Sequence, residues 1–274
     1  MTWQQLEKIF NRAMKLTFSK RKFLLVFPVL ALCGLLAVIC RTISHGVSQW
    51  MVMSMAFLPV FLCAGLLLAV GIVLTRIYHH EVKGLELQYF KTIKGAKDLF
   101  MGIPYLAVPL IFAYLILWMF LGIFYLLRAI PHMGEFIGSV LSFGPFLLVL
   151  GSLALGFLSL LTLFYVTPAA ALKSELRPQL AEEVFRSLKT NPFLSFVMPI
   201  IGLFPLLLIV GVLSLAAVVT QILYIESGGG LSIALKWFFM MLPFCGFLTP
   251  AVIFFFNFSA ESYVLMQKIF QSEQ

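Results

Sequence analysis

Six long stretches without a single Asp, Glu, Lys or Arg constrain this chain more than any other feature of its sequence. They are residues 23–40, 51–75, 99–127, 136–166, 193–223 and 237–259. The hydrocarbon core of a bilayer is about 30 Å thick, and roughly 20 helical residues cross it. Runs such as 146–161 are apolar on every side, whereas a barrel strand would alternate apolar and polar residues. The sequence therefore predicts one all-α domain, residues 1–274, built as a bundle of six transmembrane helices.

Composition independently excludes a water-soluble globule. Apolar residues make up 62% of the chain and charged residues 11%, whereas a soluble domain has about 45–50% and about 25%. So little polar surface cannot cover a globule without exposing large apolar patches to water. The same figures exclude a disordered chain, a collagen-like repeat and a disulfide scaffold.

The distribution of Lys and Arg predicts the orientation. Of the 19 basic residues, all but Arg41, Arg128 and Lys236 lie in segments that six spans place on one side of the membrane. Cytoplasmic segments collect positive charge, so we expect both termini in the cytoplasm. The basic cluster before residues 23–40 has the shape of a signal peptide, but no small-x-small cleavage site follows it. We therefore expect 23–40 to be a retained first span.

Three segments on the basic side combine an apolar stripe at helical spacing with basic residues on another face, which predicts amphipathic helices at the membrane interface. The segments are residues 3–18, 82–94 and 178–189. The stripe of the first consists of Trp3, Leu6, Phe10, Met14 and Phe18. Each segment leads into a span with an apolar residue five positions before a proline: Phe23 to Pro28, Leu99 to Pro104 and Leu194 to Pro199.

These similarities suggest three parallel repeats, each an amphipathic helix followed by two spans. The candidate units are residues 1–75, 76–166 and 167–274. Chance similarity between Phe-rich segments is the alternative.

Basic residues beside the spans are predicted to bind anionic lipid headgroups on the cytoplasmic side. Each Lys or Arg near an anionic membrane surface contributes about 1 kcal/mol. The expected contacts are Lys8, Arg12, Lys15, Lys20, Arg21, Lys22, Lys91, Lys94, Arg186 and Lys189. The net charge of +8 would also suit nucleic acid, but it is spread along juxtamembrane segments. We therefore expect membrane lipids rather than nucleic acid as partners, with a membrane-protein partner or a second copy of the chain also open.

No motif in the sequence predicts catalysis, a cofactor or a metal site. His79-His80-Glu81 looks at first like a ligand cluster, but adjacent helical side chains point about 100° apart, unlike the i, i+4 histidines of a zinc helix. We interpret it as a solvated cluster, with metal binding or catalysis as the lesser alternative. The four cysteines, Cys33, Cys40, Cys63 and Cys245, lie within spans, where small apolar packing is the default.

Carboxylates and strongly basic residues are missing from the middle of every predicted span. Ion-coupled carriers usually place such residues at membrane depth, where they are costly and functional. The most polar candidates within the spans are Thr220, Gln221 and Asn257, all toward span ends. The pattern disfavours an ion-driven transporter, although the backbone of a broken helix can also bind a solute.

Two segments resemble a group of integral membrane proteins: Thr-Pro-Ala-Ala-Ala-Leu at 167–172 and Val-Phe-Arg-Ser-Leu-Lys-Thr-Asn at 184–191. The group includes the YciC-type bacterial inner-membrane proteins and the membrane domain attached to some glycerophosphodiester phosphodiesterases. The resemblance covers residues 160–215 and the six-span plan, and it implies a bacterial inner-membrane location with an accessory or envelope-related role. It does not extend to the phosphodiesterase catalytic domain, so it implies no hydrolase activity.

Two function classes remain after these exclusions. The leading hypothesis is a non-enzymatic scaffold or accessory protein that engages anionic lipid. The alternative is a transporter or permease component for a lipid-like or weakly polar solute, suggested by Pro and Gly breaks in most spans. An intramembrane enzyme comes third, and it would need His79, His80 and Glu81 to converge with another polar group.

Overall fold

The computed structural model describes residues 3–44, 46–47, 49–84, 107–130, 134–140, 143–172, 192–220 and 230–272. These residues form helices and no strand. The helices are α1 (Trp3–Lys15), α2 (Lys20–Ile43), α3 (Gln49–Val82), α6 (Val108–Arg128), α7 (Gly134–Val140), α8 (Gly144–Leu172), α10 (Pro192–Val219) and α11 (Gly230–Ser272). Six of them, all but α1 and α7, are long and apolar enough to cross a membrane. The predicted all-α bundle of six transmembrane helices is confirmed.

The ends of these helices differ from the ends of the charge-free runs. α3 continues past the charge-free run to Val82, and α11 continues to Ser272. Polar and charged residues can extend a helix beyond the apolar segment that crosses the lipid. The predicted span 136–166 is corrected at its start, where Gly134–Val140 form the separate short helix α7 and α8 begins at Gly144. Pro145 lacks an amide hydrogen and clashes with the preceding turn, so it is tolerated only in the first turn of a helix.

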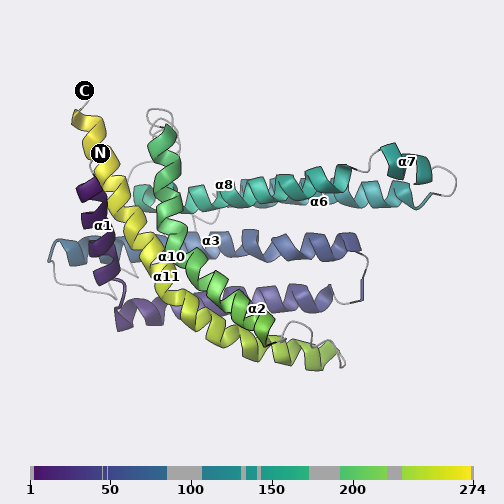
Figure 1. Cartoon of the computed structure of the whole chain (residues 1–274), viewed down its shortest axis with the longest axis horizontal. Coiled ribbons are helices and arrows are strands. Elements are labelled where there is room, and N and C mark those ends of the chain that lie inside the picture. Colours follow the sequence, from purple (N-terminus) through teal and green to yellow (C-terminus); the bar gives the residue numbers. More distant parts are fainter. Residues whose placement is uncertain are drawn as a thin grey trace.

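Consecutive long helices pack in pairs, α2 with α3, α6 with α8, and α10 with α11. Figure 1 shows α2, α3, α6 and α8 running along the long axis, while α10 and α11 cross them at a steep angle. α11 joins the pairs because it contacts α1, α2, α3, α8 and α10. α1 lies crosswise at one end of the bundle, near the end of α11 (Figure 1). We call this the α1 end.

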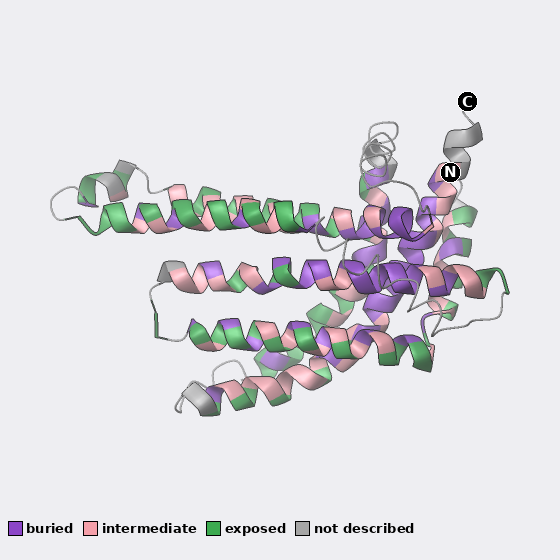
Figure 2. Cartoon of the chain, turned by 180° about the vertical axis from the view of Figure 1, so that it is seen from behind, coloured by how far each residue is buried: buried purple, intermediate pink, exposed green. Residues whose placement is uncertain are grey.

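The buried core lies at the α1 end. Its residues come from α1, the starts of α2 and α10, the second halves of α3 and α11, and the end of α8. Figure 2 shows the buried residues gathered there, while exposed residues extend along α6 and α8. Apolar side chains on α6 and α8, such as Leu126 and Leu153, are exposed in the protein alone. Lipid would cover these side chains in a membrane.

Gly71 allows α3 and α11 to pack closely in this core. A Cβ atom at Gly71 would lie 2.3 Å from Cε1 of Phe256, so α3 and α11 can approach this closely only with glycine at this position. Phe254 and Phe258 continue the buried row of α11, and both contact the ring of Phe10 from α1, with centroids 5.0 and 6.3 Å away. The core therefore joins α1 and α3 through the aromatic side chains of α11.

Candidate functional site

The first predicted amphipathic segment forms α1, and its apolar face packs on protein. Ile9 and Ala13 are buried, and Leu6, Phe10 and Met14 pack against the same core. Phe18, beyond the end of the helix, is 78% exposed. The apolar stripe thus binds α1 to α11, and the opposite face of α1 remains accessible.

Five of the predicted headgroup residues are exposed at the α1 end. Lys8, Arg12 and Lys15 lie on α1, and Lys20 and Arg21 begin α2. We call these five residues the basic surface. Four other predicted contacts, Lys91, Lys94, Arg186 and Lys189, lie outside the described residues, as do most of the second and all of the third amphipathic segment.

Lys22 is placed differently from its two basic neighbours. Its side chain is 0% exposed, and Nζ lies 2.5 Å from Oε2 of Glu81 at the end of α3. Nζ also donates a hydrogen bond to the Leu16 carbonyl at 3.0 Å and lies 5.2 Å from the centroid of the Tyr78 ring. A buried charge requires such partners. Lys22 therefore fastens α2 to α3 and is not available to a lipid headgroup.

A second ion pair joins α1 to α11. Nη1 of Arg12 lies 3.2 Å from Oε1 of Glu261 on α11, and the Tyr78 hydroxyl donates to the same oxygen at 2.8 Å. The Arg12 side chain is 45% exposed and that of Glu261 13%, so Arg12 keeps a solvent-accessible part. Sequence reasoning missed Tyr78, Glu81 and Glu261 as partners. The available signal was that all three lie beside predicted span ends on the basic side.

The side chains of the predicted cluster at residues 79–81 have separate contacts, and Glu81 pairs with Lys22. The rings of His79 and His80 lie 6.5 Å apart at 83°, and Nδ1 of His80 lies 2.8 Å from the Arg76 carbonyl oxygen. Within the described part of the chain, no three His, Cys, Asp or Glu side chains are placed to hold a metal ion.

Asn257 contacts the backbone of α1. Its side chain is fully buried, and Nδ2 donates to the Ala13 carbonyl at 3.4 Å. Its Oδ1 has no hydrogen-bond partner among the described residues. Thr220 is exposed and bonds back to the carbonyl of Ala216, while Gln221 lies outside the described residues.

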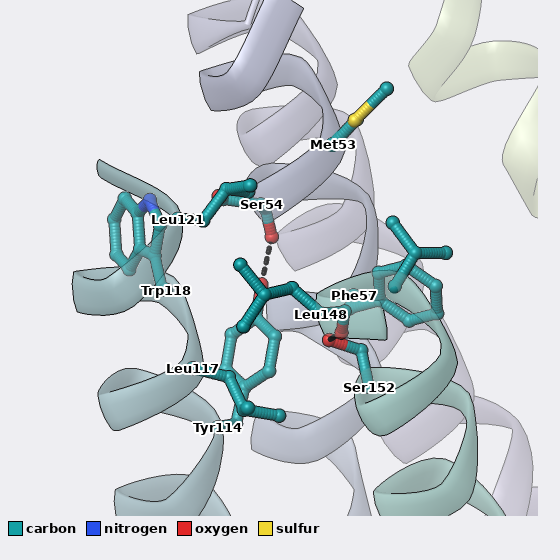
Figure 3. A pocket seen from close by; sticks show the side chains of 10 residues that line it. Met53, Ser54, Phe57, Tyr114, Leu117, Trp118, Leu121, Leu148 and Ser152 are labelled. Carbon is teal, nitrogen blue, oxygen red and sulfur yellow. Dashed lines mark hydrogen bonds between the residues drawn. The ribbon is translucent and has the colours of Figure 1, made fainter. Parts of the chain in front are cut away.

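A small cavity of about 20 Å³ lies between α3, α6 and α8. Figure 3 shows Ser54, Tyr114, Trp118 and Ser152 around it, with the Tyr114 hydroxyl bonded to the Ser54 carbonyl. A water molecule needs about 10–15 Å³, so this cavity can hold water and is too small for a solute.

A larger cavity of about 390 Å³ lies between α2, α10 and α11, away from the α1 end. Its lining is mostly apolar: Gly34, Ala37, Val38, Arg41, Ser214, Ala217, Val218, Trp237, Met240, Met241 and Phe244. We call it the α2/α10/α11 cavity. Ligand sites in proteins have volumes of about 300–1,000 Å³, so a small amphiphile or part of a larger one fits.

Comparisons with protein-family models, with curated proteins and with solved structures find no match to this chain. The basic surface and the α2/α10/α11 cavity are the features of the described residues that bear on function.

Proposed function

We propose that this protein is a non-enzymatic scaffold or accessory protein of a bacterial inner membrane that binds anionic lipid headgroups through the basic surface. The single observation that carries the proposal is the placement of α1. Its apolar face is bound to α11, so Lys8, Arg12 and Lys15 are held outward on a fixed helix. Lys20 and Arg21 add to the same end of the bundle.

The cytoplasmic orientation of the α1 end is part of this proposal. It is supported by the positive-inside rule, because only Arg41, Arg128 and Lys236 belong to the other side in the predicted topology. The bacterial inner membrane is supported by the resemblance of residues 167–172 and 184–191 to membrane proteins of that compartment.

Native mass spectrometry of the full-length protein in detergent tests the basic surface, with phosphatidylglycerol and phosphatidylethanolamine as probes. The Lys8→Gln/Lys15→Gln variant should lose its preference for phosphatidylglycerol by about fivefold per residue, as expected for about 1 kcal/mol per basic side chain. The matched control, Arg128→Gln/Lys236→Gln, removes the same charge from the other end and should lose less. Equal losses would mean that lipid retention follows net charge, and would contradict the proposal.

The second candidate is a transporter or permease component for a lipid-like solute. The observation that favours it is the α2/α10/α11 cavity, whose apolar lining suits such a solute. Proteoliposomes with a fluorescent lipid analogue test it: the protein should speed movement of the analogue between leaflets, and Ala37→Phe, which fills the cavity, should abolish the effect. No difference from protein-free vesicles would exclude this candidate.

A further inference from the structure

We propose that the α2/α10/α11 cavity holds one acyl chain of an anionic glycerophospholipid whose phosphate is bound by Arg41. This site lies away from the basic surface and is a second lipid site of the protein. It shares its cavity with the second candidate function, but a lipid held in place requires no transport. The two ideas can therefore fail separately.

The cavity has the form of a slot along one helix. Gly34, Ala37, Val38 and Arg41 follow the i, i+3, i+4, i+7 spacing of a single face of α2. The lining residues of α11, from Trp237 to Phe244, repeat this spacing. A rise of 1.5 Å per residue gives a depth of about 10 Å from Arg41 to Gly34. Each leaflet has about half of the 30 Å hydrocarbon thickness, so the slot accommodates much of one acyl chain.

The inner end of the slot is closed by packing at Gly34. A Cβ atom there would lie 2.2 Å from Sδ of Met241 and 3.1 Å from Sγ of Cys245. Toward the other end, Ala37, Ser214 and Ala217 are small and leave the space between the three helices open. Packing is therefore tight at Gly34, and the small side chains lie toward Arg41, the end at which we place the headgroup.

Charge at the open end selects the headgroup. Arg41 is exposed in the last turn of α2 and is the only ionisable residue among the described residues of the lining. No Asp or Glu lies on the described parts of α2 or α10, and the Glu261 carboxylate of α11 is at the α1 end. The guanidinium matches a phosphate in geometry and charge. Trp237 lines the slot beside it, and tryptophan is enriched at the headgroup level of membranes.

The surroundings of the slot favour lipid as its occupant. Ile39 and Leu215 flank the lining on α2 and α10, and both are exposed apolar side chains. An acyl chain in the slot would therefore be continuous with the lipid that covers these two helices.

Quenching of Trp237 fluorescence by brominated phospholipid tests the proposal directly. Trp3, Trp50 and Trp118 are replaced by Phe, and the protein is placed in phosphatidylcholine nanodiscs with increasing brominated phosphatidylglycerol or brominated phosphatidylcholine. Half-maximal quenching should need about fivefold less phosphatidylglycerol, the ratio that corresponds to ~1 kcal/mol for one basic residue at a membrane surface. Arg41→Gln should remove this preference, and Arg41→Lys should retain it.

Further variants distinguish lipid bound in the cavity from the lipid that surrounds the whole protein. Ala37→Phe fills the slot and should reduce quenching by both lipids, whereas Leu35→Phe, on the same helix but outside the lining, should not. Arg128→Gln removes a charge at the same end and should leave the preference unchanged. Equal quenching by both lipids in the Trp237 protein, or an unchanged preference in Arg41→Gln, would overturn the proposal. So would a native mass spectrum in which the protein is a dimer without bound lipid.

Discussion

Removing either partner of the Lys22–Glu81 ion pair should destabilise the fold by several kcal/mol, whereas removing both should cost less than either single change. The ammonium of Lys22 is fully enclosed and lies 2.5 Å from the Glu81 carboxylate. It joins the start of α2 to the end of α3. A charge left without its partner in such a place has no substitute for the water that it lost on folding.

The two single variants should differ in size. Loss of one partner of a buried pair costs about 3–5 kcal/mol. Glu81→Gln leaves an enclosed ammonium with neutral partners, among them the Leu16 carbonyl and the Tyr78 ring, so we expect about 5 kcal/mol. Lys22→Met leaves a carboxylate whose side chain is 14% exposed, so water can reach it and we expect about 3 kcal/mol. The Lys22→Met/Glu81→Gln double variant leaves no unpaired charge.

SDS unfolding titrations of the full-length protein in one detergent measure these differences, and the double-mutant cycle gives the coupling free energy. Glu7→Gln and Lys8→Met change the same residue types at exposed positions of α1, and they should alter the free energy of unfolding by less than about 0.5 kcal/mol. A double variant whose loss equals the sum of the two single losses would refute the reasoning.

Two further predictions concern packing at the α1 end, measured by the same titration. Gly71→Ala should cost about 1–3 kcal/mol, because its Cβ would meet Phe256. The control Gly156→Ala, with no atom within 4 Å, should stabilise α8 by up to about 1 kcal/mol; equal effects of both would contradict the close-approach argument. Asn257→Leu removes a long hydrogen bond to Ala13 and an unpaired buried oxygen, so it should be neutral within about 1 kcal/mol. A loss above 3 kcal/mol would indicate a role in holding α1 that its contacts do not explain.

The sequence predicted which segments suit lipid but not which faces of them are buried in protein. In α11, Phe247 is 63% exposed and Phe254 is 1% exposed, yet both belong to one charge-free run. Lipid tails are as apolar as Leu or Phe, so an apolar side chain gives no sign of which of the two it contacts. The six spans were therefore predictable, while the core at the α1 end was not.

For the same reason, the sequence could not show which basic residues of the candidate sites are buried. Lys20, Arg21 and Lys22 form one basic cluster in the sequence, but Lys22 shares the buried face of α2 with Val26 and Leu30. No amphipathic stripe marks that face, because the residues around it are apolar too. Arg41 lies on the predicted external side, and its place beside a cavity depends on how α2, α10 and α11 pack. The orientation and the three repeats stay predictions.

The packing of α1 on α11 has a consequence for biosynthesis. α1 precedes the other described helices in the chain and α11 follows them, so the surface that receives Phe10 is made after the five other long helices. During membrane insertion, the apolar face of α1 has only lipid to cover it until α11 is in place. α1 is therefore made before the surface on which it docks. It exchanges lipid for Phe254 and Phe258 once α11 is in place, and release of the chain before α11 would leave α1 on the membrane surface.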